Sequence, residues 1–140
     1  MHARRLVLFT IILIVLAGCS GSESGKEKPS YTPVPDQDLF AQIDQLPGLA
    51  SSDITFNDSF PEYGYVGRVV IDPQADAQKT LDTLYAILRQ GRPDAGIGIS
   101  GSQGDGGVEF ELLPGSGVGT PDQLEERYGP QPGDGAPPAD

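Results

Sequence analysis

Glycine and proline are frequent in this sequence and densest in its C-terminal part, and their number limits what the chain can fold into. They account for 19 and 13 of the 140 residues, close to the share above which a chain stops forming a compact body throughout. Ile, Leu, Val and Phe instead make up 22 of the 75 residues from 39 to 113. We therefore expect one small domain over residues 36–113, followed at 114–140 by a Gly/Pro-rich tail with a short helix near 120–128 and a disordered end.

Apolar periodicity predicts the elements of this domain. Residues 36–46 and 73–90 show helical spacing, and the second helix is expected to begin at Asp72-Pro73, with Asp72 as N-cap, and to stop at Gly91. The segments 54–60, 65–72, 97–100 and 108–113 are predicted to be strands, with an Asp105-Gly106 turn before the last one. Thr120-Pro121-Asp122-Gln123 is typical of a capped helix start.

The predicted order is thus α-β-β-α-β-β-(α). Because consecutive strands follow short links, we expect an α+β two-layer sandwich whose four-stranded antiparallel sheet carries one main helix on one face. The other face of the sheet would be mixed in polarity. It would carry Thr55, Asn57, Val66, Arg68, Val70, Ser100, Glu109, Glu111 and Leu113.

The N-terminus has the form of an export signal. His2, Arg4 and Arg5 precede an apolar run from Leu6 to Leu16. This run is shorter than the roughly 20 residues that span a bilayer, but it fits the core of a signal peptide. It closes with Leu16-Ala17-Gly18-Cys19, which resembles the lipobox of bacterial lipoproteins.

The resemblance implies that the chain is cut before Cys19 and that a diacylglycerol is attached to the Cys19 sulfur. Residues 1–18 would then be a lipoprotein signal peptide and residues 19–35 a lipidated, disordered tether. The expected location is the extracytoplasmic face of a bacterial membrane, reached by general secretion, although Arg4-Arg5 partly matches a twin-arginine signal. The composition also resembles that of small actinobacterial lipoproteins.

The charge of the mature chain restricts its partners. Loss of residues 1–18 would leave seven basic and twenty acidic residues, a formal charge of −13. Such a surface repels nucleic acid and anionic headgroups, so we expect no nucleic-acid partner and anchoring through the lipid on Cys19. Without histidine or a free thiol, the mature chain could build neither a Cys/His zinc site nor a Ser-His or Cys-His catalytic pair. We expect no cofactor and no metal.

Two motifs could carry chemistry. Residues 96–101 match G-x-G-x-x-G, but the Gly/Ile alternation is typical of a strand rather than of a phosphate-binding turn. Glu109 and Glu111 would project from one strand face about 7 Å apart, the spacing of two catalytic carboxylates, but a surface charge pair at solvent-facing strand positions explains them better. No catalytic residue is assigned.

Aromatic residues mark a possible interaction site. Tyr63 and Tyr65 flank Gly64 at a strand entrance, where they could form an exposed edge or complete the core. Tyr63, Tyr65 and Arg68 are the candidate partner-binding residues of a non-catalytic envelope module whose partner would be a protein or a polymer. The alternatives are a wall-polymer hydrolase acting through carboxylates and a carrier of small ligands or lipids.

Overall fold

The computed structural model of the chain describes residues 30–59, 61–104 and 119–139, and the backbone of 108–110. Its elements are α1 (Asp36–Ile43), β1 (Leu49–Asn57), β2 (Gly64–Ile71), α2 (Ala77–Leu88), β3 (Gly96–Gln103), β4 (Val108–Phe110) and α3 (Pro121–Tyr128). The predicted order of elements is therefore confirmed. Residues 1–29, which include Cys19, lie outside the described part of the chain, as do Phe60, the Asp105-Gly106 turn, Glu111 and Leu113.

The sheet differs from the prediction in strand direction. Its order is β1-β2-β3-β4, and the outer pairs β1–β2 and β3–β4 are antiparallel, but β2 and β3 run parallel with Gly64 opposite Gly96 and Ile71 opposite Gln103. The predicted four-stranded antiparallel sheet is therefore wrong, while the α+β class remains. The reason is α2: a helix of 12 residues returns the chain about 18 Å, which places the start of β3 beside the start of β2.

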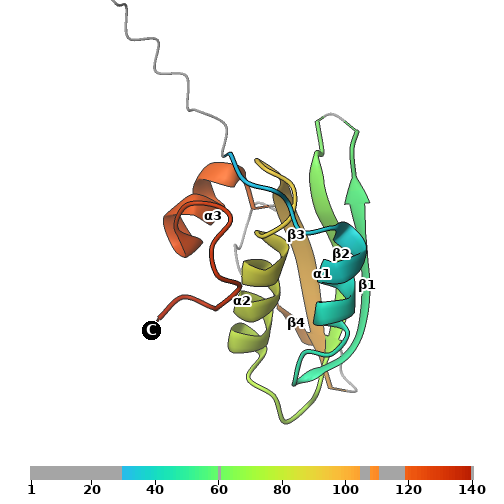
Figure 1. The fold of residues 1–140 in the computed structure, drawn as a ribbon. Helices are drawn as coiled ribbons and strands as arrows, with labels where there is room; N and C mark the ends of the chain where they lie inside the picture. The colour runs from blue at the N-terminus through green and yellow to red at the C-terminus, as the bar shows by residue number, and fades with distance from the viewer. Residues whose placement is uncertain (1–29, 60, 105–107, 111–118, 140) are drawn as a thin grey trace, which may run out of the picture.

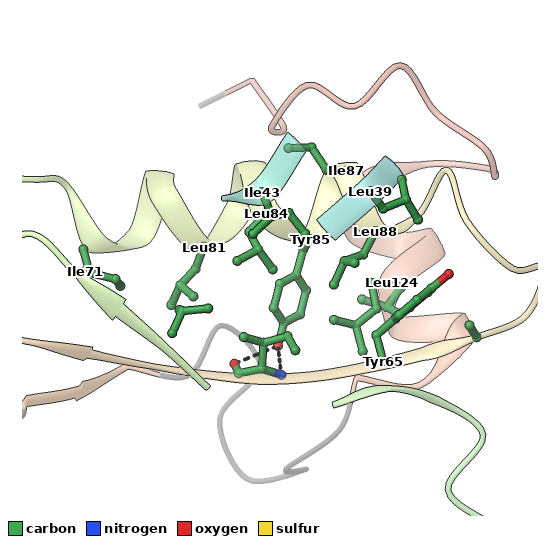
Figure 2. Close-up of a cluster of buried hydrophobic side chains, with 14 of the residues drawn as sticks. Leu39, Ile43, Tyr65, Ile71, Leu81, Leu84, Tyr85, Ile87, Leu88 and Leu124 are labelled. Atoms are coloured by element: carbon green, nitrogen blue, oxygen red, sulfur yellow. Dashed lines mark hydrogen bonds between the residues drawn. The ribbon is translucent and has the colours of Figure 1, made fainter. Parts of the chain in front are cut away.

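The core lies between this sheet and the helices (Figure 1). Leu81, Leu84 and Leu88 of α2 are fully buried against Ile71 of β2 and Ile97 of β3. Figure 2 shows Tyr85 extending from α2 to β3, where its hydroxyl accepts a hydrogen bond from the Ile99 N–H at 3.1 Å and donates one to the Ile99 carbonyl at 3.2 Å. This buried tyrosine fixes the height of α2 above the sheet.

Helix α2 begins later than its sequence predicts. The predicted N-cap, Asp72, lies in a turn in which its carbonyl accepts from the Ala75 N–H. The observed N-cap is Asp76, whose carboxylate accepts from the Lys79 N–H at 3.0 Å. Both sites offer an aspartate before the helix, and the turn at 72–75 is what allows the chain to leave β2 and cross the sheet.

Helix α3 and the residues after it belong to the domain. Thr120 and Gln123 form the predicted capping box, and Leu124 of α3 is fully buried in the core (Figure 2). Residues 129–139 were expected to be disordered, but they pack along α2, with the Gln131 side chain hydrogen-bonded to Arg89 and Arg92 main-chain carbonyls. The apolar residues of this segment are only proline and alanine. Its hydrogen bonds to the α2–β3 turn join the Gln131 side chain to main-chain groups, and apolar periodicity could not reveal them.

Candidate partner-binding surface

Four aromatic rings lead from the core to the surface at the end of the sheet where β1 stops and β2 starts. Phe40 of α1 contacts Tyr65 edge-on with 6.2 Å between ring centroids. The Tyr65 and Phe56 centroids lie 5.0 Å apart with 70° between the ring planes, and those of Phe56 and Tyr63 lie 5.1 Å apart with 87°. These are the separations and angles that aromatic pairs prefer. The series ends at Tyr63, whose side chain is held against Phe56 although the residue is 41% exposed.

Arg92, from the turn between α2 and β3, covers the same Phe56 ring. Its guanidinium carbon lies 4.1 Å from the ring centroid, within the range of cation–π attraction. The guanidinium also donates to Asp36 Oδ2 from its Nη2 at 2.8 Å and from its Nε at 3.2 Å. The planar group is therefore fixed by a ring on one side and a carboxylate at its edge.

Tyr65 joins the contacts among Arg92, Asp36 and Phe56 from the core side. Its hydroxyl donates to Asp36 Oδ1 at 2.8 Å and accepts from the Arg92 N–H at 3.2 Å. Burial raises the pKa of the Asp36 carboxyl, but the hydrogen bonds from Arg92 and Tyr65 lower it by more, so the pKa lies below its usual value. Burial raises the pKa of the Tyr65 hydroxyl far above its usual value, which keeps it protonated as a donor.

Residues 31–34 lie against the same turn. Tyr31 donates from its hydroxyl to the Gly91 carbonyl at 2.6 Å, and the Val34 N–H donates to the Gln90 carbonyl at 3.0 Å. Residues 31–35, predicted to be part of a disordered tether, are thus docked on the turn that carries Arg92. We call Tyr31, Phe56, Tyr63 and Arg92 together the Tyr63 surface.

The structure separates the three residues predicted to bind a partner. Tyr65 is fully buried, so its side chain cannot touch a partner directly. Arg68 is exposed, but it lies on the opposite face of β2, where it pairs with Asp53 of β1 and Ser100 of β3. Tyr63 belongs to the Tyr63 surface. Of the three predicted residues, Tyr63 and Arg68 are therefore surface residues at separate places, and Tyr65 is a core residue.

The far face of the sheet has the mixed character that its sequence indicates. Thr55 and Arg68 are exposed there, and Val70 is 43% exposed. These side chains share a face because residues two apart in a strand point the same way. Of the described residues, this face offers isolated apolar groups rather than a ring cluster, so it is a weaker candidate for binding than the Tyr63 surface.

The G-x-G-x-x-G motif forms a strand, as the sequence pattern indicated. Its three glycines lie within β3 rather than in a turn that opens a helix. A Cβ on Gly101 would lie 2.7 Å from Ile71 Cδ1 and 3.3 Å from the Leu81 methyls, so this glycine admits core side chains under α2. The motif serves packing and does not have the geometry that holds a pyrophosphate.

Only the backbone of one member of the Glu109 and Glu111 pair belongs to the described part of the chain. Glu109 lies in β4, paired with Ser102 of β3, and Glu111 is outside the described residues.

In the described ranges no group of three or more His, Cys, Asp or Glu residues could hold a metal ion. None of the described helices is long and apolar enough to cross a membrane.

A groove of about 400 Å³ lies elsewhere, between the α1–β1 turn and the start of α2. Leu46, Pro47, Ala75 and the N-cap residue Asp76 are among its lining residues. The positive end of the α2 dipole is already neutralised there by the Asp76 carboxylate. Lys79, Thr80 and Thr83 also line the groove. Among the described residues, no buried side-chain polar atom lacks a hydrogen-bond partner, so no unpaired polar group marks the groove as a ligand site.

No protein-family model matches the chain, and neither curated proteins nor solved structures give a match. Arg92 was not among the residues predicted to bind a partner. Its position just after the α2 stop signal at Gly91 indicates only a cation at a helix end. Its ring partner Phe56 lies 36 positions earlier in the sequence, and no local pattern joins the two residues.

Proposed function

We propose that this chain is a lipid-anchored module of the bacterial envelope that binds a protein partner through the Tyr63 surface. The anchoring half of the proposal rests on residues 1–19. A basic head, an 11-residue apolar run and Leu16-Ala17-Gly18-Cys19 together resemble a lipoprotein signal. Two acyl chains on Cys19 would hold the protein at the membrane more firmly than a single chain can.

The binding half rests on one observation, the rigid presentation of Tyr63 beside Arg92. Tyr and Arg are enriched in the few residues that carry most of the energy of protein interfaces. Both side chains are already ordered here, Tyr63 by the edge of Phe56 and Arg92 by Phe56 and Asp36. A partner would thus gain their contacts without the usual loss of side-chain entropy.

Charge indicates the chemistry of the partner. The chain carries 20 acidic against 9 basic residues, and Asp36 already neutralises Arg92. An acidic partner would be repelled, whereas a basic or neutral surface with an apolar recess for Tyr63 would be complementary. This favours a protein over an acidic wall polymer.

The anchor is tested by replacing Cys19 with Ser in cells. The variant should leave the membrane fraction or remain there as an uncut precursor, and wild type should gain a lipid label that the variant lacks. A variant that fractionates and migrates like wild type would refute the anchoring half.

The binding surface is tested by alanine substitution. Tyr63→Ala and Arg92→Ala should each lower recovery of the partner crosslinked in intact envelopes at least tenfold, as expected for central interface residues. Arg68→Ala, on the far sheet face, and Glu126→Ala, exposed on α3, serve as matched controls. Loss of recovery with Arg68→Ala alone would move the site to the far face of the sheet.

A further inference from the structure

The turn that carries Arg92 is held from its outer side by the C-terminal segment. The Gln131 side chain accepts from the Asp94 N–H at 3.0 Å and donates to the carbonyls of Arg89 at 3.0 Å and Arg92 at 3.3 Å. One amide group thus satisfies three main-chain groups at the end of α2, where carbonyls lack partners within the helix. It also holds Asp94 in a left-handed conformation with φ of 57°, which residues other than glycine rarely adopt.

Contacts on both sides of Gln131 fix it in place. Arg89, which is 4% exposed, donates a hydrogen bond to the Gly129 carbonyl. Gly135 lies against the Gln90 side chain, so closely that a Cβ there would meet Gln90 Nε2 at 2.0 Å. Residues 129–135 therefore bind the stretch from 89 to 94 at several points along its length.

The inner side of the same turn belongs to the Tyr63 surface. The Gly91 carbonyl accepts a hydrogen bond from the Tyr31 hydroxyl, and the Arg92 N–H donates one to the Tyr65 hydroxyl. The Arg92 side chain lies over the Phe56 ring. The turn is thus bonded to the C-terminal segment on one side and to the Tyr63 surface on the other. A shift of the turn would move Arg92 relative to Phe56.

We propose that residues 129–139 act as a strap, and that Gln131 sets the position of Arg92 and so the shape of the Tyr63 surface. Gln131 is a positioning residue because it touches neither Tyr63 nor Phe56 in the contacts above and acts through the turn. A molecule that displaces the strap would loosen the Tyr63 surface, and a partner that binds this surface would favour the docked strap. That the strap regulates partner binding rests on the proposed function. The coupling between Gln131 and the Tyr63 surface does not depend on it.

The coupling is tested by hydrogen exchange with mass spectrometry on the full chain in mild detergent, with no partner present. Gln131→Ala should speed exchange at least fivefold in peptides covering residues 89–97. The Asp94 N–H loses its acceptor there, and the Arg92 and Gly96 N–H groups, which donate to the Tyr65 hydroxyl and the Tyr63 carbonyl, lose protection as the turn shifts. Exchange in the middle of α2 should stay unchanged. Asp134→Ala is the matched control, because it removes a strap contact to Ala136 that does not involve the turn.

A milder variant keeps the test decisive if Gln131→Ala unfolds the protein. Gln131→Asn retains the amide on a shorter side chain and should give the same pattern at smaller amplitude. Faster exchange confined to 129–139, or a uniform rise over the whole domain, would overturn the proposal. If Gln131→Ala gives the expected exchange pattern but Tyr63→Ala does not change partner recovery, the proposal for the strap stands and only the proposed binding surface is refuted.

Discussion

Asp82 of α2 and Arg127 of α3 form a two-pronged ion pair that fastens the last helix to the domain. Arg127 donates from Nε to Asp82 Oδ1 at 2.8 Å and from Nη2 to Oδ2 at 2.7 Å. The Tyr128 hydroxyl and the Gln78 amide donate to the same carboxylate at 2.7 and 3.1 Å. Asp82 is only 6% exposed, and these four bonds compensate its loss of water.

Replacing Asp82 with Asn should lower the free energy of unfolding by about 2 to 4 kcal/mol, because Arg127 would lose its partner at a partly buried site. Urea denaturation of the purified protein measures this. Glu126→Gln, an exposed acid-to-amide change on α3, should alter stability by less than about 0.5 kcal/mol. Equal effects of the two substitutions would show that the ion pair does not secure α3.

Acid should weaken the domain in a defined range. Burial raises the pKa of Asp82, but hydrogen bonds from Arg127, Tyr128 and Gln78 lower it by more, so the pKa lies below the usual 3.8. A carboxylate with a lowered pKa in the folded state stabilises fully above its unfolded pKa, and this contribution disappears as the pH falls through the folded pKa. The wild type should therefore lose stability below about pH 4.

The Asp82→Asn variant isolates this pH effect. Its melting temperature should fall less steeply over the same acidic range, and Asp36, whose pKa is also lowered, should account for part of the remaining slope. Parallel curves for wild type and variant would contradict the role given to Asp82.

Leu124 makes α3 a part of the core. It is fully buried, so Leu124→Ala should cost about 2 to 5 kcal/mol through lost burial and the cavity left behind. A chain ending at residue 113 should lack dispersed amide resonances and a cooperative melt. A well-folded chain ending at residue 113 would show that the domain ends where the composition predicts.

The Tyr65 hydroxyl should matter more to the fold than that of Tyr63. Tyr65→Phe removes the donor to Asp36 and the acceptor for the Arg92 N–H, which should cost about 1 to 3 kcal/mol. Tyr63→Phe, at a 41% exposed residue, should cost less than about 0.5 kcal/mol. Thermal unfolding of the two variants compares them directly.

The sequence predicted what depends on neighbours in the chain. Thr120, Pro121 and Gln123 encode the start of α3 within four positions, and the structure has that capping box. The parallel pairing of β2 and β3 depends instead on how α2 returns across the sheet. A strand, a helix and another strand in succession do favour this crossover, but the short links between the other strands favoured hairpins throughout.

The site was predictable only in part for the same reason. Tyr63 was identified by its residue type and by its place at a strand entrance. Its neighbours Phe56 and Arg92 come from different elements, and nothing in the alternation of β1 shows that an arginine from the α2–β3 turn covers its ring. The strap was missed because hydrogen bonds of Gln131 to main-chain groups leave no mark in the hydrophobic pattern.

Position-specific photocrosslinking tests the central claim, that the Tyr63 surface binds a protein at the membrane. A photoreactive phenylalanine analogue would replace Tyr63 in intact cells, with the same analogue at Glu126 as the exposed control. We predict one discrete protein adduct in the membrane fraction from position 63, lost when Arg92→Ala is combined with it, and no such adduct from position 126. The same adducts from both positions, or none from position 63, would contradict the claim.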